Sequence, residues 1–408
     1  MLSLLSGTAC TTEPPPKAST SARIEIDRPT ALVDEPIRIR VAGLRPGEHV
    51  TVTSQAVDHE DLGWSARAQF TADGKGAVDL ARQRPVAGTF RHVDGMGLFW
   101  SMRPQRGEAD ESWFFSDAPA RKPSYEVRIA VRSGKREIAH RVTTRQWRAD
   151  GVRHKQLTVA DDRIDGMLFL PRSGASRKAP VLLIGGSEGG RSFDYEAALL
   201  ASRGHPALSI CYFACKGRPK ELRGIDLEYF ARAARLLQSQ SSAAPDGLAV
   251  LGASRGSEAA QLLAQYYPHL VRDAVVLAPG TRTFSPGGGS AADLVSWTRA
   301  GRPIRLDPIP LNRVRGTVLA VAGKDDRLWP SADAAASIAE RINASGTRHQ
   351  ALIYDAAGHG GAGVPYQATG RWMSHPVSKQ WIDLGGTPAA DARSKADSWP
   401  RILQLLDR

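Results

Sequence analysis

A serine flanked by glycines is the strongest candidate for a catalytic group in this 408-residue chain. Residues 252–256 read GASRG, after an apolar stretch at 248–251 and before an amphipathic stretch at 257–267. A G-x-S-x-G segment between a strand and a helix makes a sharp turn that exposes the serine hydroxyl. We therefore predict that Ser254 is a nucleophile; the alternative is an ordinary serine in a surface glycine turn.

A serine hydroxyl needs a base, and the base needs an orienting acid. In chains with this motif the order is serine, acid, histidine. Of the ten histidines, only His359 both follows the candidate acids and lies in a glycine-rich loop after the last major apolar stretch, so we predict it as the base. Asp325 and Asp326 both follow an apolar stretch. We prefer Asp326, three residues after Gly323, because this spacing is frequent in hydrolases.

Acyl transfer through a serine also requires donors for the oxyanion of the tetrahedral intermediate. We expect one from the backbone N–H of Arg255 and a second from Ser187 or Glu188, in the glycine-rich segment 185–190. That segment lacks the Gly-Lys-Ser/Thr of a phosphate loop and the G-x-G-x-x-G of a dinucleotide site. The predicted chemistry needs neither a metal nor an organic cofactor.

The elements that must position these groups follow from the apolar pattern. Continuous apolar runs alternate with helical stretches, which is typical of a mostly parallel, doubly wound sheet. This α/β domain is predicted over residues 151–408. Its strands are expected at 181–184, 207–210, 248–251, 274–277, 317–321 and 351–354, and its helices at 195–203, 225–238 and 257–267.

Residues 23–150 have a different pattern, in which apolar and polar residues alternate. Alternation bounded by glycine and proline predicts short antiparallel strands, and several of them indicate a β-sandwich. Residues 72–76, ADGKG, predict a hairpin turn between two of the strands. We interpret this domain as structural or substrate-shaping. Its strands are expected around 37–41, 50–53, 65–71, 126–131 and 139–144.

Residues 1–22 are predicted to be a signal or a disordered tether. The stretch MLSLLSGTAC followed by a Pro/Ser/Thr-rich segment resembles a bacterial lipoprotein signal, in which Cys10 would be lipidated and the protein exported. The alternative is an ordinary frayed N-terminus in the cytoplasm. For Cys211 and Cys215 we favour small buried thiols; a disulfide between them is the alternative in an exported protein.

Composition narrows the classes of function. Hydrophobic residues make up 42% and charged residues 24%, which excludes a fully disordered chain. The 54 Lys and Arg exceed the 42 Asp and Glu, so the formal net charge is +12. The basic residues are scattered, so we expect no nucleic-acid partner. A membrane contact is expected only through lipidation at Cys10.

Longer motifs resemble a known family, that of acyl-CoA thioesterases and bile acid-CoA:amino acid N-acyltransferases, in a bacterial version. They are LVDEPIRI at 32–39, GLRPG at 43–47, GMGLFWSMRP at 95–104, GASRGSE at 252–258, DD at 325–326 and GH at 358–359. The resemblance implies an immunoglobulin-like β-sandwich before an α/β-hydrolase domain. It also implies a catalytic triad of Ser254, Asp326 and His359.

These observations predict a serine acyl hydrolase that cleaves acyl-CoA thioesters or related acyl esters. One alternative is an acyltransferase with an amine acceptor; that branch of the family typically carries cysteine as nucleophile, and Ser254 favours water. Another is a non-catalytic binding lipoprotein. Lipidation at Cys10 would place the protein where coenzyme A is scarce, which favours an ester or amide substrate instead.

Overall fold

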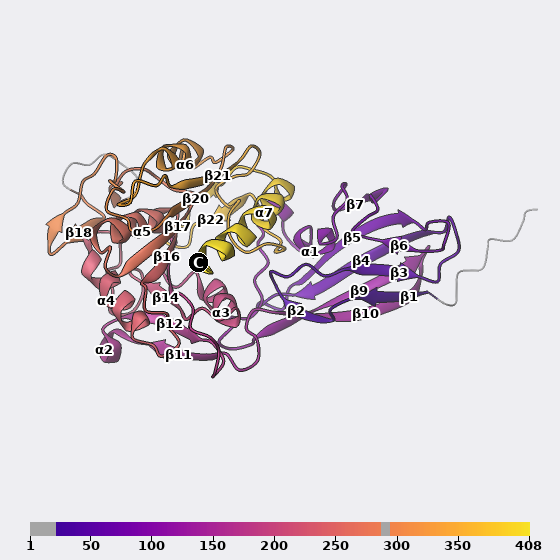
Figure 1. The fold of residues 1–408 in the computed structure, drawn as a ribbon. Helices are drawn as coiled ribbons and strands as arrows, with labels where there is room; N and C mark the ends of the chain where they lie inside the picture. The colour runs from indigo at the N-terminus through magenta and orange to yellow at the C-terminus, as the bar shows by residue number, and fades with distance from the viewer. Residues whose placement is uncertain (1–21, 287–293) are drawn as a thin grey trace, which may run out of the picture.

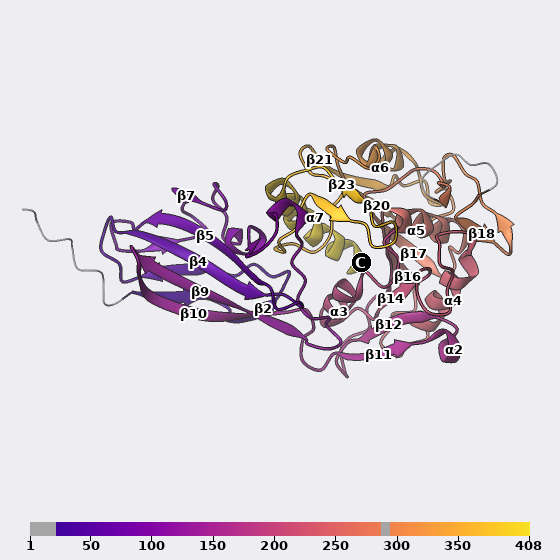
Figure 2. The same ribbon diagram turned by 180° about the vertical axis from the view of Figure 1, so that it is seen from behind.

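The computed structural model describes residues 22–286 and 294–408. Figures 1 and 2 show an elongated β-rich part, formed by the N-terminal third, beside a larger part of mixed helices and strands. Cys10 lies outside the described residues, and so does nearly all of the predicted tether. Among the described residues, no helix has the length and apolarity needed to cross a membrane.

The β-rich part contains two sheets. The smaller has the order β1 (Arg23–Ile26), β3 (Ile39–Ala42), β6 (Val78–Asp79). The larger has the order β2 (Thr30–Leu32), β10 (Arg136–Gln146), β9 (Ser124–Ser133), β4 (His49–Val57), β5 (Gly63–Thr71), β7 (Ala87–Gly88), and β8 (Arg103–Pro104) pairs with β5. Burial alternates along β4 and β5, as the period-two pattern predicts.

The predicted hairpin at residues 72–76 is wrong. The turn itself exists, because the N–H of Gly76 donates to the carbonyl oxygen of Asp73 at 2.9 Å. However, β5 before it pairs with β4, and β6 after it pairs with β3 in the other sheet. The turn therefore carries the chain from one sheet to the other, which a local turn motif does not distinguish from a hairpin.

The larger part is built on an eight-stranded sheet. Its order is β11 (Arg153–Leu157), β12 (Asp165–Leu170), β14 (Ala207–Cys211), β13 (Val181–Ile184), β16 (Leu248–Ala253), β17 (Val271–Leu277), β20 (Val318–Gly323), β21 (Gln350–Tyr354). The strands from β14 to β21 are parallel, whereas β11 and β12 are antiparallel additions at one edge. The sheet is therefore mostly parallel, as predicted.

Helices cover both faces of this sheet. α3 (Asp194–Ser202) and α7 (Pro388–Leu406) share a core with the β-rich part, and in Figures 1 and 2 they lie on the side facing it. α4 (Leu227–Gln238), α5 (Arg255–Tyr266) and α6 (Ser331–Glu340) share the core on the opposite face. The fold is doubly wound because neighbouring strands send their connections to different faces.

Smaller elements complete the fold. The helix predicted from about residue 225 begins two residues later, because Ile225 and Asp226 form a short strand and the Asp226 carboxylate caps α4 by accepting the N–H of Glu228 at 2.9 Å. The remaining elements are α1 (Gly97–Trp100), η1 (Ala109–Glu111), α2 (Val159–Asp162), β15 (Ile225–Asp226), β18 (Trp297–Arg299), β19 (Arg302–Pro303), β22 (Trp372–Ser374) and β23 (Trp381–Asp383).

The structure pairs Cys211 and Cys215 as a disulfide, so the interpretation of two buried free thiols is wrong. The bridge closes the loop that follows β14. The same loop touches the glycine-rich segment, because the N–H of Gly190 donates to the carbonyl oxygen of Phe213 at 3.3 Å. The sequence alone left both forms open, since a four-residue spacing permits either.

Candidate active site

Ser254 occupies the sharp turn between β16 and α5. Its backbone has φ 52° and ψ −121°, a region that non-glycine residues rarely adopt. A Cβ on Gly252 would overlap the carbonyl oxygen of Gly256, and a Cβ on Gly256 would overlap those of Ile184 and Gly185. Both glycines are therefore required by close backbone packing, which holds the serine in this strained conformation.

His359 lies against Asp326 and not against Asp325. Its Nδ1 is 2.8 Å from Asp326 Oδ2, and the Asp326 side chain is only 1% exposed. Asp325 instead contacts Arg327 at 2.7 Å and accepts the N–H of Gly386 at 3.0 Å. An Nδ1–H that donates to Asp326 leaves Nε2 as the basic nitrogen of the ring.

The loop that carries His359 is fixed from both sides. The N–H of His359 donates to Leu384 O at 2.7 Å, and that of Gly358 donates to Asp391 Oδ1 at 2.8 Å. The Trp329 ring meets the imidazole edge to face, with 5.6 Å between centroids. Its indole N–H donates to Ala278 O at 3.1 Å. The imidazole orientation is thus determined by contacts on several elements.

The glycine-rich segment after β13 passes next to Ser254. A Cβ on Gly186 would lie 3.0 Å from the Ser254 Cβ. The Gly186 N–H donates to Glu188 Oε1 at 2.8 Å, and the Tyr212 hydroxyl lies 2.7 Å from the Gly186 carbonyl oxygen. The Ser187 hydroxyl contacts His375 Nε2 at 3.0 Å. These contacts fix the segment in which the second oxyanion donor is expected.

The backbone N–H of Arg255 is the first of α5. The first N–H groups of a helix have no acceptor within that helix, and they carry the positive end of its dipole. This N–H follows Ser254 directly, so its position suits a donor to an oxyanion formed there. The roles of Arg255, Ser187 and Glu188 as donors stay predictions.

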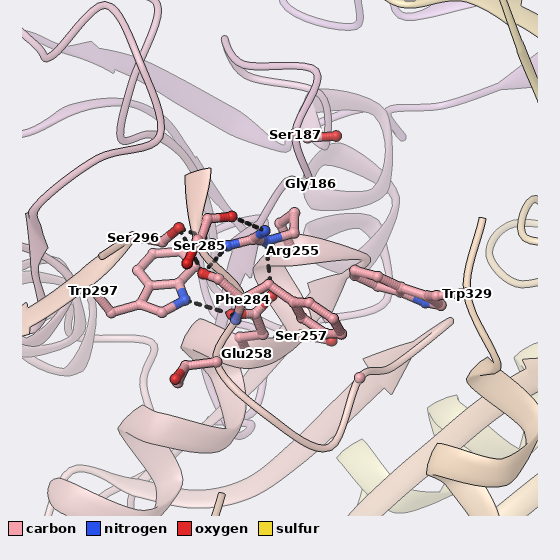
Figure 3. Close-up of polar contacts among 12 residues, drawn as sticks. Gly186, Ser187, Arg255, Ser257, Glu258, Phe284, Ser285, Ser296, Trp297 and Trp329 are labelled. Carbon is pink, nitrogen blue, oxygen red and sulfur yellow. Dashed lines mark hydrogen bonds and ion pairs between the residues drawn. The ribbon is translucent and has the colours of Figure 1, made fainter. Parts of the chain in front are cut away.

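The side chain of Arg255 forms a buried network that the sequence analysis missed (Figure 3). Its Nε lies 2.7 Å from Glu258 Oε1, and both residues are buried. Its Nη2 donates to Phe284 O at 2.7 Å and to Ser296 Oγ at 2.6 Å. Glu258 Oε2 accepts the indole N–H of Trp297 at 2.7 Å. The pair therefore anchors two distant segments to the start of α5.

This network extends to the catalytic histidine candidate. The Phe284 ring stacks on Trp329 with 5.1 Å between centroids, and Trp329 contacts His359. Burial raises the pKa of Glu258 to about 7, while Arg255 opposes that rise. An acid three residues after Arg255 is visible in the sequence, but its burial depends on segments near residues 284 and 296, which no local pattern connects to it.

Ser254, His359, Ser187 and Glu188 all line one cavity of about 570 Å3. Both parts of the molecule contribute walls, and most of the wall residues are aromatic or aliphatic. The β-rich part supplies Trp113, Phe114, Phe115 and Trp147; the larger part supplies Phe193, Tyr195, Leu277, Leu328, Val364, Met373, Trp381, Ile382 and Leu384. No group of three or more His, Cys, Asp or Glu suited to a metal occurs in the described part of the chain.

A mostly parallel sheet with helices on both faces and a serine at a strand-to-helix turn defines an α/β hydrolase. Two family descriptions match this chain. Residues 34–159 match "Acyl-CoA thioester hydrolase/BAAT N-terminal region", and residues 225–293 and 300–408 match "BAAT / Acyl-CoA thioester hydrolase C terminal". The chain belongs to this family of enzymes.

Curated relatives agree with that assignment. Acyl-coenzyme A thioesterase 5 of Mus musculus is 29% identical over 403 residues, which cover 92% of this chain and 93% of the relative. The mitochondrial acyl-coenzyme A thioesterase 2 of Rattus norvegicus is 28% identical over 430 residues, which cover 97% of this chain and 93% of the relative.

Solved structures resemble this chain more distantly. A putative dienelactone hydrolase from Klebsiella pneumoniae has a TM-score of 0.42 and 13% identity, covering 63% of this chain and 99% of its own. The α/β hydrolase MGS-M1, from a deep-sea metagenome library, has a TM-score of 0.37 and 15% identity. The match covers 51% of this chain and 84% of MGS-M1.

Proposed function

We propose that this protein is a serine acyl hydrolase that cleaves acyl-CoA thioesters through Ser254, His359 and Asp326. The observation that carries the proposal is the 2.8 Å contact between His359 Nδ1 and Asp326 Oδ2 beside the cavity that Ser254 also lines. Family membership supports the thioester as the substrate class. The curated relatives named above are acyl-CoA thioesterases, which supports it further.

The proposed reaction has two halves. Ser254 Oγ attacks the thioester carbonyl while His359 Nε2 accepts its proton, and Asp326 stabilises the imidazolium. The N–H of Arg255 and one from Ser187 or Glu188 hold the oxyanion. The thiolate of coenzyme A leaves with the proton from His359. Water, deprotonated by His359, then attacks the acyl-enzyme, and the free acid and Ser254 are released.

The aromatic walls of the cavity suit the apolar part of an acyl group. Trp113, Phe114 and Phe115 come from the β-rich part, so we infer that this domain, residues 23–150, shapes the substrate cavity. We also infer that it is an immunoglobulin-like β-sandwich, since its two sheets share one core. The catalytic domain in this proposal covers residues 151–408.

The choice of acceptor follows from the atom at position 254. The acyl-enzyme on Ser254 is an oxygen ester, which amines attack less readily than a thioester. We therefore propose water as the acceptor. Incubation with an acyl-CoA and excess glycine or taurine tests this, because an acyltransferase would yield mostly the N-acyl conjugate.

The central test compares wild type with Ser254→Ala on acyl-CoAs of graded chain length and on matched p-nitrophenyl esters. We expect wild type to release thiol, and the variant to lose several orders of magnitude in kcat with an unchanged thermal midpoint. A fluorophosphonate probe should label wild type at Ser254. Absence of both turnover and labelling in wild type would instead indicate a non-catalytic binding protein.

A further inference from the structure

The active-site cavity is also lined by polar groups for which the proposed mechanism has no use. Glu196, Gln367 and Lys395 line the same cavity as Ser254, among mostly apolar neighbours. Glu196 comes from α3 and Lys395 from α7, the two helices that face the β-rich part. Charged side chains beside an apolar acyl cavity are costly unless something pairs with them.

Lys395 is the most informative of the three. The residue is only 5% exposed, and its Nζ donates to Thr369 Oγ1 at 3.3 Å and lies 5.8 Å from the centre of the Trp113 ring. No carboxylate oxygen of the described residues lies within 4.0 Å of it. Burial lowers the pKa of the ammonium, and the more distant Asp391 and Glu196 oppose that change.

The two neighbours also have unused hydrogen-bonding capacity. Gln367 Oε1 accepts the Tyr125 hydroxyl at 3.3 Å, while its Nε2 has no partner among the described residues. Glu196 Oε2 likewise has none within the described structure. Burial raises the pKa of Glu196 to about 7, so near neutral pH a large fraction of this carboxyl is protonated and can donate.

An ammonium, an amide NH2 and a protonated carboxyl are all donors. The group that complements them is an anion with several acceptor positions, and a carboxylate provides up to four. A methyl-ended acyl chain would leave the ammonium desolvated and unpaired, whereas a carboxylate would pair with it. Such pairing would favour a carboxylate-ended acyl group over a methyl-ended one of equal length.

We propose that Lys395, assisted by Glu196 and Gln367, is a specificity-determining group that selects acyl groups carrying a carboxylate at the end remote from the thioester. This proposal rests on the proposed thioesterase function. It assigns Lys395 no part in bond cleavage, which Ser254 and His359 perform. It predicts that selectivity, and not catalysis as such, depends on the charge at position 395.

The test uses matched pairs of acyl-CoAs, dicarboxylic and monocarboxylic, at each chain length from succinyl/butyryl to suberyl/octanoyl. We expect wild type to have the higher kcat/KM for the carboxylate-ended member at the chain length that fits. Lys395→Met keeps the side-chain length and removes the charge. It should lower the ratio of the two kcat/KM values by about tenfold or more, the usual worth of a charged hydrogen bond.

Two further variants separate charge at the cavity from general effects. Glu196→Gln keeps a donor at this position but cannot ionise, so above about pH 7, where Glu196 loses its proton, it should raise the same ratio, opposite to Lys395→Met. Arg393→Met removes a cation from the exposed side of α7 and should leave the ratio unchanged. Isothermal titration of adipate into Ser254→Ala and into Ser254→Ala/Lys395→Met measures the subsite without turnover, and the second protein should bind at least about tenfold more weakly.

The outcomes distinguish this proposal from the one on which it rests. If no acyl-CoA of either kind is cleaved, the proposed function itself fails. If monocarboxylic acyl-CoAs are cleaved and preferred, the proposed carboxylate subsite is wrong, but the proposed thioesterase function is unaffected. The same conclusion follows if Lys395→Met lowers kcat/KM equally for both members of a pair. A preference for ω-hydroxyacyl-CoAs over both members would replace the carboxylate with a neutral acceptor and overturn the assignment.

Discussion

Asp325 and Asp326 are neighbours in the chain but face different surroundings. The Asp326 carboxylate is buried against His359 and also accepts the N–H of Leu328 at 2.9 Å, whereas Asp325 contacts a partly exposed arginine. Residue type, order and spacing led to the prediction of Ser254, Asp326 and His359 as a set, since each lies just past a strand end; the structure places His359 against Asp326, and His359 and Ser254 on one cavity. The networks around Glu258 and Lys395 could not be predicted, because their partners come from distant segments.

The two aspartates provide a test at the scale of one residue. Asp326→Asn should lower kcat by up to about 10⁴-fold, since an asparagine no longer holds His359 in the tautomer with Nε2 basic. Asp325→Asn should have a far smaller effect, because its carboxylate contacts Arg327 and Gly386. Steady-state kinetics on the best acyl-CoA measures both. A larger loss in Asp325→Asn would contradict the assignment of the acid.

Glu258 should make stability depend on pH. Its pKa is about 7 in the fold against 4.5 for an ordinary glutamate, so the folded state binds more protons in between. Stability attributable to this group is therefore greatest below about pH 4.5 and falls as the pH rises to about 7. Urea unfolding of wild type and Glu258→Gln across this range measures the effect.

Glu258→Gln should be less stable overall, because Arg255 loses its buried partner, but its unfolding free energy should fall less between pH 4.5 and 7. Glu196→Gln is a useful comparison, since the pKa of Glu196 is also raised to about 7 by burial, without an ion pair. Identical pH slopes for wild type and Glu258→Gln would show that Glu258 titrates normally.

At the scale of elements, the strands that carry the site were the most predictable. β13 has the predicted bounds, and β16 and β20 end two residues beyond theirs. Short continuous apolar runs that alternate with helical stretches are typical of strands buried on both faces of a parallel sheet. The predicted hairpin failed because β6, the short strand after the turn, pairs with β3 far away in the sequence. The antiparallel edge strands β11 and β12 are consecutive in the chain, and β11 was not predicted because its residues, RHKQL, are mostly polar and exposed.

The turn between β16 and α5 can be tested through its second glycine. Gly256→Ala places a methyl group against the carbonyl oxygens of Ile184 and Gly185, so the start of α5 or the end of β13 must move. We expect a loss of more than about 2 kcal/mol in unfolding free energy, together with lower kcat. Gly74→Ala has no atom within 4 Å of the new methyl and should change stability by less than about 0.5 kcal/mol.

At the scale of the whole molecule, the two parts are joined by a buried carboxylate. Asp34, in the β-rich part, accepts hydrogen bonds from Arg203 Nε at 2.6 Å and from the Trp399 indole at 2.7 Å. These partners lie at the end of α3 and within α7, the helices that also carry Glu196 and Lys395. The two separate folding patterns were predictable, whereas a contact between residues 34 and 399 was not.

The junction can be tested through Asp34 itself. Asp34→Ala leaves the buried Trp399 indole N–H without its acceptor and removes the nearest carboxylate from the partly buried Arg203, which keeps Glu35 at 3.8 Å, so unfolding free energy should fall by about 1 to 3 kcal/mol. Asp34→Asn retains an oxygen that can accept the Trp399 N–H, so its unfolding free energy should fall less than that of Asp34→Ala. Because Trp113, Phe114 and Phe115 reach the cavity from the β-rich part, loosening the junction should raise KM for acyl-CoA more than it lowers kcat. Urea unfolding and steady-state kinetics on both variants measure these effects, and an Asp34→Ala protein with wild-type stability and KM would show that the cavity wall does not depend on this contact.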